Sequence, residues 1–199
     1  EDLFDDVDLS RTVGWFTSIF PVHLRLPVAN ESTDTNVGEM LKSIKEQLRA
    51  IPNKGIGYGL LRYLNSDENV RNSLEMLPQP EISFNYLGQL DQALPDSAPF
   101  ALANEPSGSV HSDEGKRKHL IDLRSHIADG QLHVLFVYSS NLYHESTIEE
   151  LAQSYIAALR LLIAHCQSPT AGGFTPSDFP LADLDQDELD NAFDELEFA

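Results

Sequence analysis

The sequence predicts a mixed α/β fold, an α+β two-layer sandwich in which helices cover a sheet. Two observations predict it. An Asp-Gly dipeptide at 129–130 lies between two alternating runs, which is typical of an antiparallel hairpin. Apolar residues also recur at helical spacing over 37–51 and 146–166. With 199 residues, 41% of them hydrophobic, the chain can form one domain, or one large lobe, with its own core.

The first 51 residues combine a strand pattern with a helix pattern. Residues 22–26 alternate between apolar and polar side chains, which predicts a short strand. Apolar side chains then follow from Val37 to Ile51 at spacings of 4, 3, 4 and 3. This spacing predicts an amphipathic helix that is capped by Asn36 and stops before Pro52.

The middle of the chain contains shorter segments and one long irregular stretch. Residues 60–64 are apolar, and residues 69–77 are predicted to be helical. Alternation over 81–87 predicts a second strand. Residues 91–118 are rich in Pro, Ala, Ser, Gly and charge, and a loop of this length usually has a function of its own.

The Asp129-Gly130 turn fixes the register of the predicted hairpin. A two-residue loop pairs Ala128 with Gln131 and His126 with His133. One face then carries the apolar side chains Ile121, Leu123, Ile127, Leu132, Val134, Phe136 and Tyr138. The other face carries Asp122, Arg124, His126 and His133, together with Leu135 and Val137. We therefore expect one buried face and one mixed face.

The C-terminal third is predicted to hold a long helix and an acidic tail. Ser146 and Glu149 form a capping-box pattern, and the helix that follows extends to about Cys166. Residues 169–180 are predicted to be a loop. The tail, residues 182–199, carries eight acidic residues. Its apolar residues have the spacing of a short amphipathic helix: Leu189, Phe193 and Leu196.

Charge and composition exclude several classes of function. The chain has 13 Lys and Arg against 32 Asp and Glu, a net charge of −19. Such a chain is a poor partner for nucleic acid or for an anionic membrane, since both need clustered cations. No apolar run approaches the length of a membrane span. A single cysteine, Cys166, excludes an internal disulfide, and this together with an N-terminus unlike a signal peptide predicts a cytoplasmic protein.

Common catalytic and cofactor motifs are absent or weak. Gly55, Gly57 and Gly59 lack the third glycine of a dinucleotide motif, because Leu60 stands there, so a tight packing turn is the simpler interpretation. His126 and His133 could be two metal ligands, but no third ligand has a recognised spacing, and we predict no metal. Cys166 is predicted to be a small buried hydrophobe.

Three segments have unusual compositions. Residues 11–21 read RTVGWFTSIFP and hold the only Trp of the chain. Residues 52–59 read PNKGIGYG, and residues 84–88 read FNYLG. Asn85 stands in a predicted strand, where its propensity is poor, so it is held there by a functional site or by a structural hydrogen bond. Alternation puts Asn85 and Tyr86 on opposite faces unless a bulge intervenes.

Together these three segments resemble the epimerization domains of nonribosomal peptide synthetases. That family has RTVGWFT leading to a proline, then PxxGxGYG, then FNYLG, in this order. Phe20 departs from the pattern, since the family usually has Tyr before the proline. Residues 175–181, TPSDFPL, resemble its closing segment. The resemblance covers roughly residues 1–181.

The resemblance implies one lobe of a larger domain. The fold expected is a chloramphenicol-acetyltransferase-like lobe of a condensation/epimerization domain, in which two lobes enclose a tunnel. Residues 1–181 would be the C-terminal lobe, and residues 182–199 an acidic linker or docking helix. The family's HHxxxDG motif and most of its acidic motif are absent from this chain, so we expect the chain to be inactive without its N-terminal lobe.

The resemblance also implies a reaction and its site. The reaction converts the L-residue of a carrier-bound aminoacyl or peptidyl thioester to the D form by removal and return of the α-proton. Asn85 and Tyr86 are the implied catalytic residues. The implied lining of the substrate tunnel or lobe interface is Trp15, Phe16, Thr17, Gly57 and Tyr58. No cofactor is bound directly, because the substrate hangs on the phosphopantetheine of a carrier protein.

The expected partners are the carrier protein and the missing lobe, with a downstream synthetase subunit as a further candidate for the acidic tail. Two rival functions share the same fold and partners. One is condensation, that is, peptide-bond formation, although residues 15–17 favour epimerization. The other is a lobe that binds carrier proteins without catalysis. Dual condensation and epimerization is also compatible with the sequence.

Overall fold

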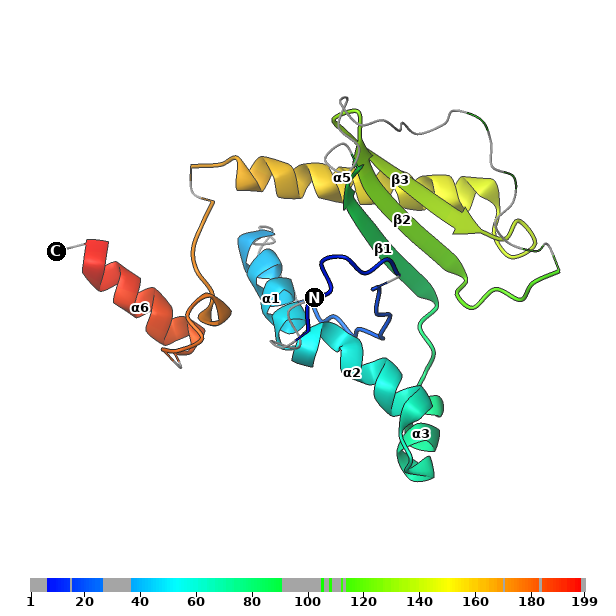
Figure 1. Ribbon diagram of the computed structural model, residues 1–199. Helices are drawn as coiled ribbons and strands as arrows, with labels where there is room; N and C mark the ends of the chain where they lie inside the picture. The colour runs from blue at the N-terminus through cyan, green and yellow to red at the C-terminus, as the bar shows by residue number, and fades with distance from the viewer. Residues whose placement is uncertain are drawn as a thin grey trace. The chain divides into compact units, whose positions relative to one another are not determined.

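The computed structural model describes residues 7–14, 16–26, 37–90, 105, 108, 112, 114–169, 171–182 and 184–197. The chain divides into two compact units, which are described separately (Figure 1). The first comprises residues 1–78 and 158–199, and the second residues 79–157. Helices and strands are mixed, which confirms the predicted α/β class.

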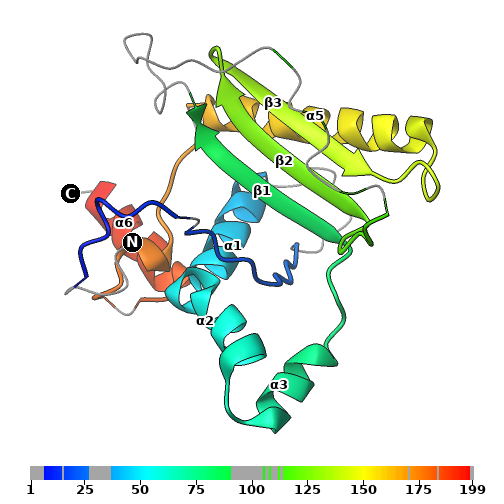
Figure 2. The same ribbon diagram turned by 45° about the vertical axis from the view of Figure 1, so that its right-hand side comes forward.

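The second unit is built on a sheet of three strands in the order β1-β2-β3, shown side by side in Figure 2. Strand β1 (Ile82–Gln89) pairs in parallel with β2 (Ile121–Ala128). Strand β3 (Gln131–Tyr138) pairs antiparallel with β2. Parallel neighbours need a long crossover connection, and residues 90–120 lie between these two strands.

The predicted hairpin register is confirmed. Ala128 pairs with Gln131, Ile127 with Leu132 and His126 with His133. Asp129 has φ +52° and Gly130 φ +66°, as a two-residue turn with left-handed residues requires. The apolar face is the buried one, since Ile121 and Leu123 are each less than 10% exposed.

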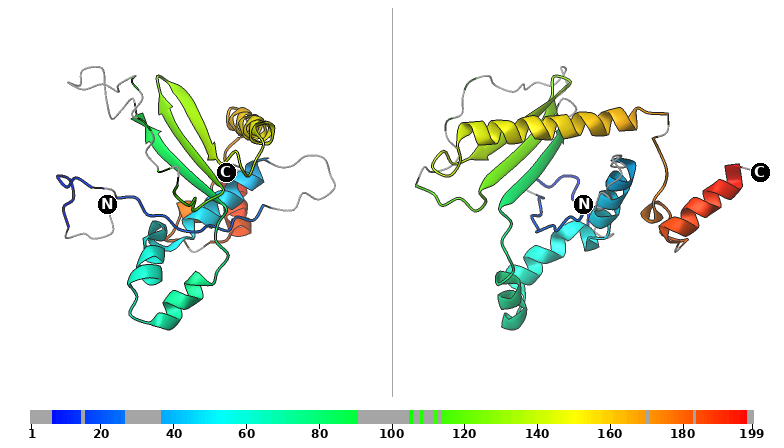
Figure 3. Two further views of the ribbon diagram at one scale, coloured as in Figure 1. Left: turned by 90° about the vertical axis from the view of Figure 1, so that its right-hand side faces the viewer. Right: turned by 180° about the vertical axis from the view of Figure 1, so that it is seen from behind.

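Helix α5 (Glu145–Cys166) begins in the second unit and covers the Leu123 face of the sheet (Figure 3). The ring of Tyr155 meets the ring of Phe136 edge-on at 6.0 Å, and Ile148 is 5% exposed. The helix starts one residue before Ser146, so the prediction that Ser146 caps it is wrong; boundary residues of this kind are weakly encoded.

The first unit holds the remaining helices. Helix α1 (Val37–Arg49) confirms the predicted amphipathic helix. The chain then turns through η1 (Pro52–Gly55) into a short α2 (Ile56–Gly59) and a π-helical turn η2 (Leu60–Leu64). Helix α3 (Glu68–Glu75) is capped by Asp67, whose carboxylate accepts a hydrogen bond from the Asn69 backbone N–H at 2.8 Å.

The predicted strand at 22–26 is wrong: these residues are described and form no strand. Their backbone finds a side-chain partner instead. The Arg25 N–H donates to Gln47 Oε1, and Gln47 Nε2 donates to the Arg25 carbonyl, both at 2.7 Å. The amide of Gln47 on α1 thus occupies the place that a neighbouring strand would take.

The closing segment contacts α1 near the end of the chain. The 3₁₀ turn η3 (Pro176–Asp178) has a capping box in which the Asp178 carboxylate accepts from the Thr175 backbone N–H at 3.0 Å. Helix α6 (Gln186–Glu197) follows and confirms the helix predicted in the tail. Leu189 is 3% exposed, and the Phe193 ring stacks on the Phe174 ring at 4.8 Å.

Candidate active site

Asn85 and Tyr86 lie in the middle of β1, one of the two edge strands of the described sheet. In the parallel register Asn85 is opposite Arg124 and Tyr86 is opposite Ser125. The register is regular at both positions, so the two side chains point to opposite faces, as strand alternation predicts. Asn85 therefore shares the mixed face with Arg124, and Tyr86 shares the α5-covered face with the buried Ser125.

A β-bulge follows directly after Tyr86. Tyr86 pairs with Ser125 and Gln89 pairs with Ile127, so β1 has one residue more than β2 across this interval. Gly88 has φ +81° there, a conformation that L side chains rarely adopt. The Leu-Gly end of the FNYLG motif thus has a structural reason: it ends the regular pairing immediately beyond Asn85 and Tyr86.

The Asn85 side chain is exposed and makes no hydrogen bond to any other described residue. Of the two explanations for an Asn at this position, the structural hydrogen bond therefore receives no support from the described part of the chain. An exposed amide beside an arginine can donate to or accept from a ligand.

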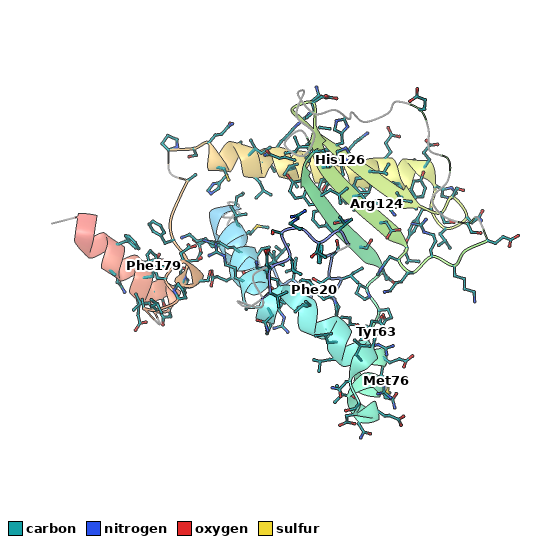
Figure 4. All side chains as sticks on the ribbon, in the orientation of Figure 1. Phe20, Tyr63, Met76, Arg124, His126 and Phe179 are labelled. Carbon is teal, nitrogen blue, oxygen red and sulfur yellow. The ribbon has the colours of Figure 1, made fainter. Side chains whose placement is uncertain are left out.

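Several polar groups share this face with Asn85, alongside the apolar Leu135 and Val137. The Asp122 carboxylate accepts a hydrogen bond from Ser83 Oγ at 2.5 Å and forms an ion pair with Arg117 at 3.0 Å. Arg117 also donates to the carbonyl of Val137 at 2.7 Å. The charge of the Asp122 carboxylate is thus balanced by Arg117. Arg124 follows Asp122 two residues along β2 (Figure 4).

Two of the three segments with unusual composition, residues 11–21 and residues 52–59, contact each other in the first unit. Ser18 Oγ donates to the Lys54 carbonyl at 3.5 Å. Gly55 is buried against Phe20, and a Cβ added at Gly55 would overlap the Phe20 ring. The Phe20 ring therefore leaves room only for a glycine at position 55. Phe20 stands where the epimerization domains that this chain resembles usually have Tyr.

Within residues 52–59, Gly55 is the glycine at which a Cβ would clash, and Gly57 and Gly59 have open space around them. A Cβ added at Gly57 or Gly59 would meet nothing within 4 Å, so the predicted close packing at these two positions is wrong for the described residues. Asn53, Lys54 and Gly55 have φ of +47°, +52° and +80°, three left-handed residues in succession. This turn determines where α2 begins.

The other predicted lining residues are placed as follows. Phe16 is 54% exposed, Thr17 is exposed and Tyr58 is half-buried. Trp15 lies outside the described residues. Their predicted role at a tunnel or lobe interface stays a prediction.

The histidine pair and Cys166 are placed as follows. The rings of His126 and His133 stack at 5.1 Å with an interplanar angle of 10°. Among the described residues no group of three or more His, Cys, Asp or Glu could hold a metal ion. Cys166 is exposed rather than buried, so the prediction of a buried hydrophobe is wrong.

A hollow of about 290 Å³ lies in the first unit between α1, the end of α5 and residues 171–175. Its polar lining includes Lys42, Lys45 and His165. Lys45 already binds Asp178 at 2.5 Å, and none of the predicted site residues lines the hollow. We therefore do not regard it as the active site.

Sequence reasoning missed the position of Arg124 beside Asn85. The alternation along 121–128 placed Arg124 on the polar face of the hairpin, but nothing in the local pattern predicted that β1 joins β2 in parallel. The predicted hairpin gave residues 121–128 a partner strand at one edge only. That open edge was the signal that another strand, here β1, pairs with β2.

Comparison with known proteins gives a consistent family. Residues 4–184 match the Condensation domain family. The chain is 52% identical over 190 residues to a linear gramicidin synthase of Brevibacillus parabrevis, covering 96% of this chain and 2% of that protein. It is 40% identical over 190 residues to surfactin synthase subunit 1 of Bacillus subtilis, covering 96% and 5% respectively.

A solved structure is also similar. It is the crystal structure of the epimerization domain from the third module of tyrocidine synthetase B, with a TM-score of 0.68 and 38% sequence identity. The match covers 83% of this chain and 35% of that one. The chain therefore spans about a third of the solved domain and a small part of the synthetases.

Proposed function

The chain belongs to the condensation-domain family of nonribosomal peptide synthetases, and we propose that it is the C-terminal lobe of an epimerization domain. In this proposal residues 1–181 form the lobe and residues 182–199 a tail. The observation that carries the proposal is the likeness to the tyrocidine synthetase epimerization domain, which extends over 83% of the chain. The segment at residues 15–17 supports epimerization over condensation.

The proposed reaction inverts the Cα of an aminoacyl or peptidyl thioester. A base takes the α-proton, the electron pair of that C–H bond moves into the thioester, and negative charge collects on the carbonyl oxygen. An acid on the opposite face then returns a proton to Cα. The substrate is carried on the phosphopantetheine of a carrier protein, and the base and acid come from the upstream lobe.

Asn85 contributes to this reaction through its exposed amide. A donor aimed at the thioester oxygen stabilises the enolate more than the neutral thioester, so it lowers the barrier to deprotonation. Tyr86 lies on the other face of the strand, and its role in this proposal is to position or relay a proton. Trp15, Phe16, Thr17, Gly57 and Tyr58 line the tunnel or the lobe interface in this proposal.

The role of Asn85 is tested by Asn85→Ala in the full epimerization domain with a carrier loaded with an L-aminoacyl thioester. Formation of the D-residue, followed by chiral analysis, should fall about 100-fold or more. Binding of the loaded carrier should be unchanged, and Asn141→Ala, at an exposed site after β3, serves as the matched control. Turnover at the unaltered rate in Asn85→Ala would remove Asn85 from the mechanism.

Condensation is the second candidate, because the family model that matches is that of the Condensation domain. It would join two carrier-bound substrates through an amide bond. Asn85 could then orient an acceptor amine in place of stabilising an enolate. The two reactions differ in products, so a reaction with two loaded carriers separates them.

A further inference from the structure

Arg124 stands directly beside Asn85 on the mixed face of the sheet. The two residues are paired in the parallel register of β1 and β2, and neighbouring strands lie about 4.8 Å apart. Paired residues of parallel strands point to the same face. The two side chains therefore start from neighbouring positions on one face, and a ligand placed over this face could meet both of them (Figure 4 labels Arg124).

The charges around this pair favour an anionic group. The three described strands carry one acidic side chain, Asp122, and its carboxylate is already bound by Ser83 and Arg117. His126 comes two residues after Arg124 on the same face, and its ring stacks on His133. Among the described residues, Arg124 and the Arg117 that binds Asp122 thus stand against a single acid on this side of the sheet, in a chain with a net charge of −19.

We propose that Arg124 is a second group, alongside Asn85, that stabilises the negative charge on the thioester oxygen. This proposal rests on the proposed function. When the α-proton leaves to the base of the upstream lobe, the electron pair forms the C=C bond of the enolate and charge moves to oxygen. Arg124 stays protonated throughout, and the charge on oxygen returns to Cα when the second proton is delivered.

An arginine side chain suits this role better than a lysine side chain. An arginine guanidinium is a delocalised cation that presents several N–H donors in one plane. A fixed positive charge and the Asn85 amide can therefore act on the same oxygen without either group changing its protonation state.

The test compares Arg124→Gln and Arg124→Lys with Asn85→Ala in the full epimerization domain. The measured quantity is exchange of the α-proton for deuterium in a carrier-bound L-aminoacyl thioester in heavy water. Arg124→Gln should lower kcat for exchange about 100-fold while the half-saturating carrier concentration stays unchanged, and Arg124→Lys should recover part of the rate. Arg160→Gln, exposed on α5, removes the same charge elsewhere and should exchange normally.

The outcomes separate this inference from the proposed function. Absence of exchange in the unaltered domain overturns the proposed function. Impaired exchange in Asn85→Ala, combined with full exchange in Arg124→Gln, overturns only the role of Arg124. If Arg124→Gln does not fold, Arg124→Lys decides: lysine keeps the charge without the planar donors, so exchange should fall about tenfold, and an unaltered rate contradicts the proposal.

Discussion

At the scale of single residues, the clearest constraint is the contact between Gly55 and Phe20. A side chain at 55 would overlap the Phe20 ring, and the backbone at 55 is left-handed with φ +80°. Both features penalise any L side chain. Since Phe20 belongs to the first motif and Gly55 to the second, one contact explains why two distant segments of unusual composition occur together.

We expect Gly55→Ala to lower the free energy of unfolding by about 3 kcal/mol, from left-handed strain and overpacking together. Gly59→Ala is the matched control, because φ at Gly59 is −63° and a Cβ there meets nothing within 4 Å. It should be neutral or stabilise by up to about 1 kcal/mol. Urea unfolding of the domain measures both, and equal effects would contradict the account of this contact.

At the scale of elements, α1 is held to η3 by a cluster of ions. The Asp178 carboxylate binds Lys45 at 2.5 Å and Arg49 at 2.6 Å, and Ser177 Oγ donates to Glu46 at 2.5 Å. The hydrogen bonds from Lys45, from Arg49 and from the Thr175 backbone lower the pKa of Asp178 far below its ordinary value. The charged carboxylate is therefore the form that joins the two elements.

The pH dependence of stability follows from this shift. A carboxylate with a lowered pKa contributes stability above its unfolded pKa of about 4 and loses it as pH falls toward the folded value. We expect unfolding between about pH 4 and pH 2 to be less acid-sensitive in Asp178→Asn than in the unaltered chain. Glu150→Gln, exposed on α5, is the control. Identical acid sensitivity in all three would contradict the role of Asp178.

The acidic helix α6 is attached by its apolar side. Phe193 stacks on Phe174, and its ring centroid lies 6.0 Å from that of Phe179. Leu189 is almost fully buried on the same helix. Two of the three apolar residues predicted for docking to another subunit are thus engaged within the chain, and docking through α6 stays a prediction that must rely on its acidic side.

We expect Phe193→Ala to release α6. Loss of the ring removes the stacked and tilted contacts with the two other phenylalanines and should cost about 3 kcal/mol of local stability. Limited proteolysis should then cut near residues 182–186 much faster than in the unaltered chain. Gln153→Ala, at an exposed position of α5, controls for general loosening. A protected tail in Phe193→Ala would contradict the aromatic attachment.

Local patterns predicted some elements better than others, for physical reasons. The hairpin register was predictable because the Asp-Gly turn fixes it within the sequence itself. The fate of residues 22–26 was not, because the Gln47 side chain takes up their backbone hydrogen bonds from 22 residues away. The placement of Arg124 beside Asn85 likewise depends on a parallel pairing across a long connection, which alternation does not encode.

At the scale of the whole molecule, family and fold agree. The chain belongs to the condensation-domain family and resembles about a third of a solved epimerization domain. None of the described helices is long and apolar enough to cross a bilayer. The motif alone predicts Asn85 and Tyr86 as catalytic residues, and that role stays a prediction; the geometry of the second unit adds the face of the sheet on which Asn85 lies.

We propose that the full domain epimerizes a carrier-bound residue. The most direct measurement supplies one carrier with an L-aminoacyl or L-peptidyl thioester and a second loaded carrier in heavy water. Mass spectrometry follows deuterium at Cα and amide products, and chiral analysis follows the D-residue. We predict deuterium uptake and a D-residue on the first carrier without a new amide bond. Amide formation without deuterium uptake would contradict epimerization and assign the chain to condensation.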